Sequence, residues 1–118
     1  MAYERPGEKL TGHAAAADYS VTGQYLAVQV TAEGVVTLAA GNAGVVGVLQ
    51  NDPIAGAAAE VMTTGTTKAI AGAIIAVGAE VEVESGGKFI TLAAGMKRGV
   101  ALAAAAADGD LITVLLQG

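Results

Sequence analysis

Forty-four of the 118 residues are Ala or Gly, and this limits what the chain can build. Val, Ile, Leu and Phe together number only 30. Ordering the backbone costs about 1–2 kcal/mol per residue, while burial returns about 25 cal/mol per Å² of apolar surface. Small side chains return little, so we expect one domain that is marginally stable alone and gains stability from oligomerisation or from docking on a larger assembly.

The apolar pattern from Val21 onward is that of β-strands. Large apolar residues alternate with smaller or polar ones over 26–30, and Val81 and Val83 alternate with glutamates. Turn-forming Gly, Asn, Asp and Pro recur at short intervals, and no Ala run lies in a long segment of helical period. The pattern predicts an all-β fold, a small β-barrel-like domain over residues 21–118 with at most one short helix.

The first twenty residues differ from the rest. They show no clean period of a strand or a helix, and the sequence Arg5-Pro6-Gly7 disfavours a regular element there. We interpret residues 1–20 as an extended N-terminal arm. A disordered tail is the alternative interpretation.

A weak internal repeat runs through the chain. The sequence TLAAG occurs at 37–41 and again at 91–95, an offset of 54, and flanking segments match at offsets of 53 and 55. Either the fold is duplicated, over about 23–65 and 78–118, or the match is coincidence in a chain rich in Ala and Gly. Neither half has many large apolar residues, so we expect the halves to share one core. The strands expected to be equivalent are 24–30 with 79–84, and 58–64 with 111–117.

Residues that carry chemistry are scarce. The chain has one His, no Cys and two Ser, and it lacks the common nucleophile, phosphate-loop and zinc-protease motifs. His13 could be a general base or a metal ligand, but a solvated arm residue is the favoured interpretation. Asp52 and the Asp108-Gly109-Asp110 sequence lie in turn contexts, where such side chains stabilise the turn, although a catalytic carboxylate pair is conceivable.

Three glutamates lie on one face of a predicted strand. Glu80, Glu82 and Glu84 alternate with two valines, and three carboxylates together could hold Ca²⁺ or Mg²⁺. The favoured interpretation is a solvated outer face that discourages edge-to-edge pairing. We therefore expect no catalytic residue, no cofactor and no metal.

Charge and hydropathy exclude two further classes of partner. The net charge is −5, the six basic residues are scattered, and only four residues are aromatic, so we expect no nucleic-acid partner. The longest uncharged apolar run, 69–79, is too short to span a bilayer, and the N-terminus has no apolar signal stretch. We expect no membrane partner. Because we expect no catalytic residue, we also expect no small-molecule substrate.

An ordered set of short motifs covers nearly the whole chain. It begins with Tyr-x-Arg-Pro-Gly-x-x-Leu-Thr at 3–11 and continues with GVVGVL at 44–49 and GAEVEV at 78–83. GVALAAA at 99–105 and the closing DLITVLL at 110–116 complete it. This set resembles the capsid cement, or decoration, proteins of tailed bacteriophages.

The resemblance implies a small β-barrel-like (β-tulip) domain with an N-terminal arm, made in the bacterial cytoplasm and placed on the exterior of the virion capsid. It implies a homotrimer that clamps neighbouring major capsid subunits against internal DNA pressure. It carries over no catalytic residue, only capsid or subunit contact by the arm, at Tyr3, Arg5, Pro6 and Leu10. The alternatives are another phage structural module, of a tail or fibre, and a small β-barrel enzyme or ligand-binding protein.

Overall fold

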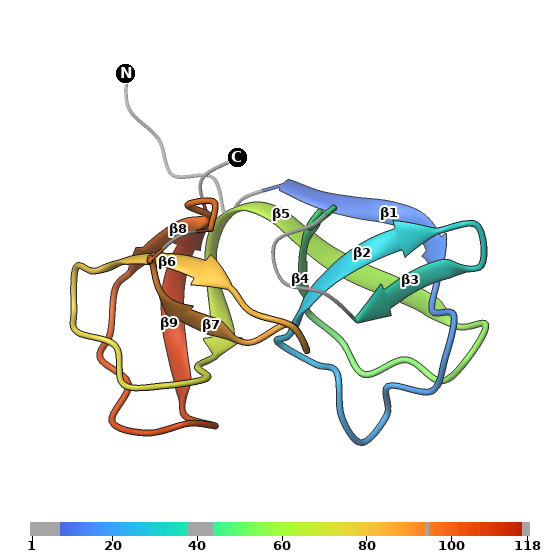
Figure 1. Cartoon of the computed structure of the whole chain (residues 1–118). Helices are drawn as coiled ribbons and strands as arrows, with labels where there is room; N and C mark the ends of the chain where they lie inside the picture. Colours follow the sequence, from blue (N-terminus) through green and yellow to red (C-terminus); the bar gives the residue numbers. More distant parts are fainter. Residues whose placement is uncertain (1–7, 38–43, 94, 117–118) are drawn as a thin grey trace.

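The computed structural model describes residues 8–37, 44–93 and 95–116, which form one curled, antiparallel sheet (Figure 1). The all-β prediction is confirmed, and the described residues contain no helix. The order across the sheet is β3-β2-β4-β5-β9-β8-β6-β7, with β1 also paired to β5. The strands are β1 (Glu8–Ala14), β2 (Ala27–Thr31), β3 (Gly34–Thr37), β4 (Gly47–Leu49), β5 (Ala58–Ile70), β6 (Glu80–Val83), β7 (Phe89–Thr91), β8 (Gly99–Ala101) and β9 (Leu111–Leu116).

Strand β5 joins two lobes that lie side by side (Figure 1). Its first part pairs with β1 and β4, and its last part, from Gly65, pairs with β9. Gly65 has a φ of 100°, a conformation that favours glycine, at the point where β5 passes from one lobe to the other. We call residues 8–64 the first half and residues 65–116 the second half.

The two halves have the same strand order and the same strand directions. In each half a hairpin (β2–β3 or β6–β7) pairs with a short strand (β4 or β8), which pairs with a longer strand (the first part of β5, or β9). The registers agree, because Val28 is opposite Gly47 as Val81 is opposite Gly99. Isolated parallel bridges agree as well, Ala15 with Val35 and Ala71 with Phe89. Positions related in this way are called equivalent below.

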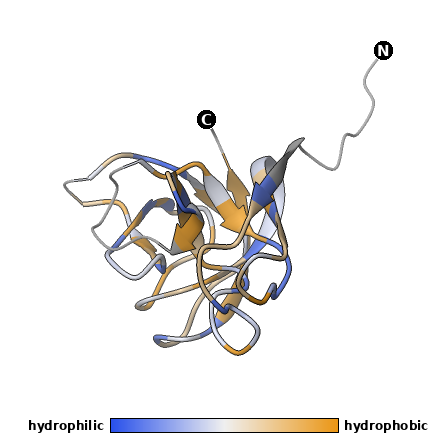
Figure 2. Ribbon diagram, turned by 90° about the vertical axis from the view of Figure 1, so that its right-hand side faces the viewer, coloured by the Kyte–Doolittle hydropathy of each residue, from blue (hydrophilic) through white to orange (hydrophobic). Residues whose placement is uncertain are grey.

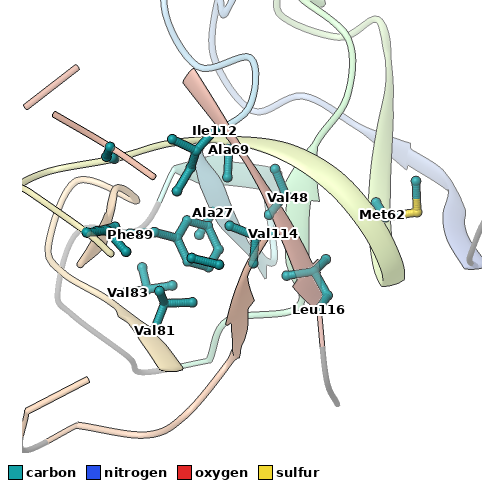
Figure 3. Packing of buried hydrophobic residues seen from close by; sticks show 14 residues of the cluster. Ala27, Val48, Met62, Ala69, Val81, Val83, Phe89, Ile112, Val114 and Leu116 are labelled. Carbon is teal, nitrogen blue, oxygen red and sulfur yellow. The ribbon is translucent and has the colours of Figure 1, made fainter. Parts of the chain in front are cut away.

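The expectation of one shared core is met in part, because the larger apolar cluster draws on both halves while the first half also has a smaller cluster of its own. Leu49 and Val61 belong to the cluster of the first half, and Phe89 lies in the larger cluster of the second half. The larger cluster also includes three first-half residues, Ala27, Val48 and Met62 (Figure 3). Two cores form because each sheet half curls tightly enough to bury its own inward face, and they meet only where the first half packs on the second.

Part of the expected arm belongs to the sheet. Glu8–Ala14 is strand β1, antiparallel to β5, with irregular register between Leu10 and His13. Tyr19 is 9% exposed within the first-half cluster. β1 is defined by its backbone pairing with β5, and its sequence has no apolar alternation that would predict it. Tyr3, Arg5 and Pro6 lie outside the described residues.

Candidate contact surfaces

Four connections lie at the same end of the strands, along the lower side of Figure 1. They join β1 to β2, β4 to β5, β5 to β6, and β8 to β9. We call this end of the molecule the loop face. Its segments are 15–26, 50–57, 71–79 and 103–110.

Backbone hydrogen bonds tie the loops together in pairs. In the first half the amide of Tyr19 donates to the carbonyl of Pro53 at 2.8 Å. In the second half Ile75 and Ala105 exchange two such bonds, at 2.9 and 3.0 Å. Because their backbone groups are satisfied by each other, these loops are held in fixed positions and can present their side chains to a partner without first becoming ordered.

Large apolar side chains protrude from the loop face. Val21 is 93% exposed, Ile54 61%, Ile74 74% and Val77 66%. Orange patches mark apolar residues on the loops in Figure 2. Single exposed apolar residues are common on proteins, but these four lie at one end of the molecule, which makes the loop face a candidate contact surface.

The same loops carry acidic side chains that are engaged locally. The Asp18 carboxylate accepts hydrogen bonds from the backbone N–H and the hydroxyl of Ser20, at 2.9 and 2.6 Å, and these lower the pKa of Asp18. Asp110 Oδ2 accepts the amides of Ala106 and Ala107, at 2.7 and 3.2 Å. These acids stabilise turns as the sequence indicates, and they give the loop face an acidic character.

The glutamate strand differs from the solvated face that its sequence indicates. Glu80 is exposed and pairs with Lys97 at 2.9 Å, but Glu82 is only 7% exposed. Glu82 Oε2 accepts the amide of Ala93 at 2.6 Å and that of Gly95 at 3.3 Å, so it holds the β7–β8 connection. The expectation is wrong for Glu82 because this connection folds back over the strand. Within the described ranges no three His, Cys, Asp or Glu side chains gather as a metal site would require.

Two residues singled out by sequence lie in β1. His13 is half-buried and pairs with Ala59, and Leu10 pairs with Val61. The structure does not bring His13 into a site with the turn carboxylates of the loop face, because β1 places it within the sheet.

A small pocket of about 60 Å³ lies where the two halves meet. Its lining includes Val46 and Thr63 from the first half, and Phe89, Arg98 and Leu116 from the second. Sites for small-molecule ligands commonly occupy about 300–1,000 Å³, so this pocket is small for a substrate.

No helix in the part of the chain that the structure describes is long and apolar enough to cross a membrane.

Sequence reasoning missed the apolar residues of the loop face. Val21 and Ile54 stand among Ala, Gly, Pro and polar residues, whereas Ile74 and Val77 lie in the apolar run 69–79. A large apolar residue within a segment of turn residues is the signal that could have found Val21 and Ile54.

Comparison with known proteins shows the family and the fold of this chain. No curated protein sequence matches the chain significantly. Among solved structures, the N base of the head fiber gp8.5 in bacteriophage phi29 matches with a TM-score of 0.71 and 20% identity, over 93% of this chain and 95% of that one. This likeness shows a shared fold. A family model described as phage cement protein matches residues 9–117, and the chain therefore belongs to the phage cement protein family.

Proposed function

We propose that this chain binds the exterior of the phage head and clamps neighbouring major capsid subunits, with the loop face against the shell. The observation that carries the proposal is the loop face of a cement-family protein, with four exposed apolar residues on hydrogen-bonded loops. A structural role of this kind needs shape and exposed contacts rather than reactive groups.

The chemistry of the loop face supports a partner of complementary chemistry. The face combines apolar side chains with the carboxylates of Asp18, Asp52 and Asp108, and the only lysine paired there among the described residues is Lys88, 3.0 Å from Asp108. A complementary patch on the capsid has apolar hollows bordered by Lys or Arg. A major capsid protein whose outer surface has such patches at subunit boundaries fits this face.

The N-terminal segment is a second contact in this proposal. Glu8 begins β1 opposite Thr64, whereas Ala14, at the other end of β1, lies beside the loop face. The chain before Glu8 therefore starts from the end opposite the loop face. Tyr3, Arg5 and Pro6 extend from there to a neighbouring subunit or the shell, and a homotrimer on the head exterior brings three such segments into one assembly.

Phage heads assembled without this chain test the proposal. Purified chain is added to them, and bound protein is measured after sedimentation. Ile74→Ser and Val21→Ser should each weaken binding about tenfold, because each removes an anchor that becomes buried. Both side chains are exposed in the free chain, so circular dichroism should be unchanged.

Met96→Ser is the matched control. Met96 is 59% exposed but lies on the β7–β8 connection, at the opposite end of the strands. It should bind heads as the unaltered chain does. Equal binding by all variants would exclude the loop face as the shell contact, and no binding by the unaltered chain would exclude the function.

A fibre base is the second candidate, favoured by the shared fold with the head fiber N base of phi29. Cryo-electron microscopy of the virions distinguishes the two functions. Density that continues outward from this domain as a stalk would favour the fibre base, and a domain that ends at its own surface would favour cement.

A further inference from the structure

Each side of the contact between the two halves has an equivalent surface on the other half, and both equivalent surfaces have exposed apolar residues. The outward side of β4 and of the first part of β5 packs against the second half, where Val48 is 0% exposed and Met62 7%. The amide of Ala27 donates to the carbonyl of Gly87 in the β6–β7 turn, at 2.8 Å. Gln50 Nε2 donates to Thr67 Oγ1 at 2.7 Å across the same contact.

The equivalent outward side of the second half is not covered in this way. Val48 pairs with Met62 as Val100 pairs with Leu115, so Val100 is equivalent to Val48 and Leu115 to Met62. Both second-half residues are nevertheless only half-buried. Leu102, which follows β8 as Gln50 follows β4, is 47% exposed. We call Val100, Leu102 and Leu115 the β8–β9 face.

The other side of the contact is exposed at one equivalent position of the first half. Val83 of the second half is 0% exposed, but its equivalent in the first half, Val30, is 37% exposed. The β6–β7 turn packs against the beginning of β2, whereas the β2–β3 turn points away from the second half at the far edge of Figure 1. We call Val30 and the β2–β3 turn the β2–β3 edge.

We propose that a second copy of this chain docks its β2–β3 edge on the β8–β9 face and so repeats the contact between the halves. The two surfaces are different, so the contact is heterologous and forms a ring if the rotation closes. The number of copies rests on the proposed function, which has three. In a ring of three chains, the six halves surround one axis.

One charged position distinguishes the two surfaces. Glu80 is equivalent to Ala27, which touches the β6–β7 turn within the chain. Glu80 pairs with Lys97, so the next copy's β2–β3 turn meets an ion pair rather than a lone carboxylate. That turn carries Glu33, which Lys97 can also attract.

The oligomeric state of the free chain tests the proposal without phage heads. Sedimentation velocity of the unaltered chain should show a closed oligomer. Leu102→Asp and Val30→Asp should each raise the dissociation constant at least about 100-fold, because a carboxylate would be buried in an apolar contact. Both positions are exposed in the monomer, and circular dichroism verifies that both variants fold.

Leu111→Asp is the matched control. Leu111 is 52% exposed, on the same strand as Leu115, but its equivalent, Ala58, is exposed and takes no part in the contact between the halves. This variant should remain oligomeric.

An equal mixture of Leu102→Asp and Val30→Asp should form a dimer and nothing larger, because only one pair of intact surfaces remains between them.

Three results would overturn the proposal. The first is that the unaltered chain is a monomer at millimolar concentration. The second is that the oligomer persists in both the Leu102→Asp and the Val30→Asp variants. The third is that Leu111→Asp raises the dissociation constant as much as those two substitutions do. A free chain that is oligomeric as expected but does not bind heads would contradict the proposed function alone.

Discussion

Gly47 and Gly99 occupy equivalent places in the two halves, and each lies against a carbonyl oxygen of the neighbouring strand. A Cβ at Gly47 would overlap with the carbonyl oxygen of Met62, and one at Gly99 would overlap with that of Leu115. Neither glycine has a positive φ, so close approach of the strands rather than backbone conformation requires glycine here. The same steric requirement at both places is a strong sign that the halves share one structural plan.

Alanine at Gly47 or Gly99 should destabilise the fold by about 3 kcal/mol, since backbone must move to make room. Denaturant unfolding followed by circular dichroism measures this loss. Gly109→Ala is the control, because a Cβ there meets nothing within 4 Å and only its φ of 93° opposes the substitution. It should lose about 1 kcal/mol. Equal losses at all three sites would show that the strands can separate freely.

Glu82→Ala should destabilise the fold by about 2–3 kcal/mol, because the amides of Ala93 and Gly95 would lose their acceptor. Glu82→Gln should lose about 1 kcal/mol or less, since an amide oxygen can still accept. The first half already has glutamine at the equivalent position, Gln29. Hydrogen exchange at the Ala93 amide should be faster in Glu82→Ala than in Glu82→Gln. An unchanged exchange rate in Glu82→Ala would contradict the role of this carboxylate.

The sequence predicts the strands well and the surfaces poorly, for physical reasons. Alternation around Val28 and Val81 is a local property of the sequence, so the all-β fold could be predicted, although burial itself does not alternate in these strands. β1 could not, because its pairing with β5 depends on a distant partner. Glu82 was misjudged because the connection that buries it lies more than ten residues further along the chain. The loop face depends on which turns meet in space, and periodicity does not report that.

Ser20→Ala should raise the pKa of Asp18 toward the ordinary value of 3.8, because the hydroxyl of Ser20 is the largest cause of its lowering. A lowered pKa means that Asp18 favours the folded loop above pH 3.8, and that this contribution is lost as the pH falls through the folded-state pKa. An NMR titration of the Asp18 carboxyl carbon measures the shift. Thr22→Ala is the control and should leave it unchanged. A pKa that does not move in Ser20→Ala would show that the backbone bond alone lowers it.

Deleting residues 2–7 should separate the contact role of the N-terminal segment from folding. The deletion leaves β1 and its pairing with β5 intact, so the free energy of unfolding should change by less than about 0.5 kcal/mol. Head binding should weaken severalfold, because Tyr3, Arg5 and Pro6 are removed.

Deleting residues 2–14 is the contrasting variant. It removes β1 and exposes one edge of the first part of β5, so this variant should lose its cooperative unfolding transition or aggregate. Circular dichroism and light scattering report these outcomes, and sedimentation with heads reports binding. If the chain without residues 2–7 binds heads with unchanged affinity, Tyr3, Arg5 and Pro6 make no contact, and the loop face must account for attachment alone.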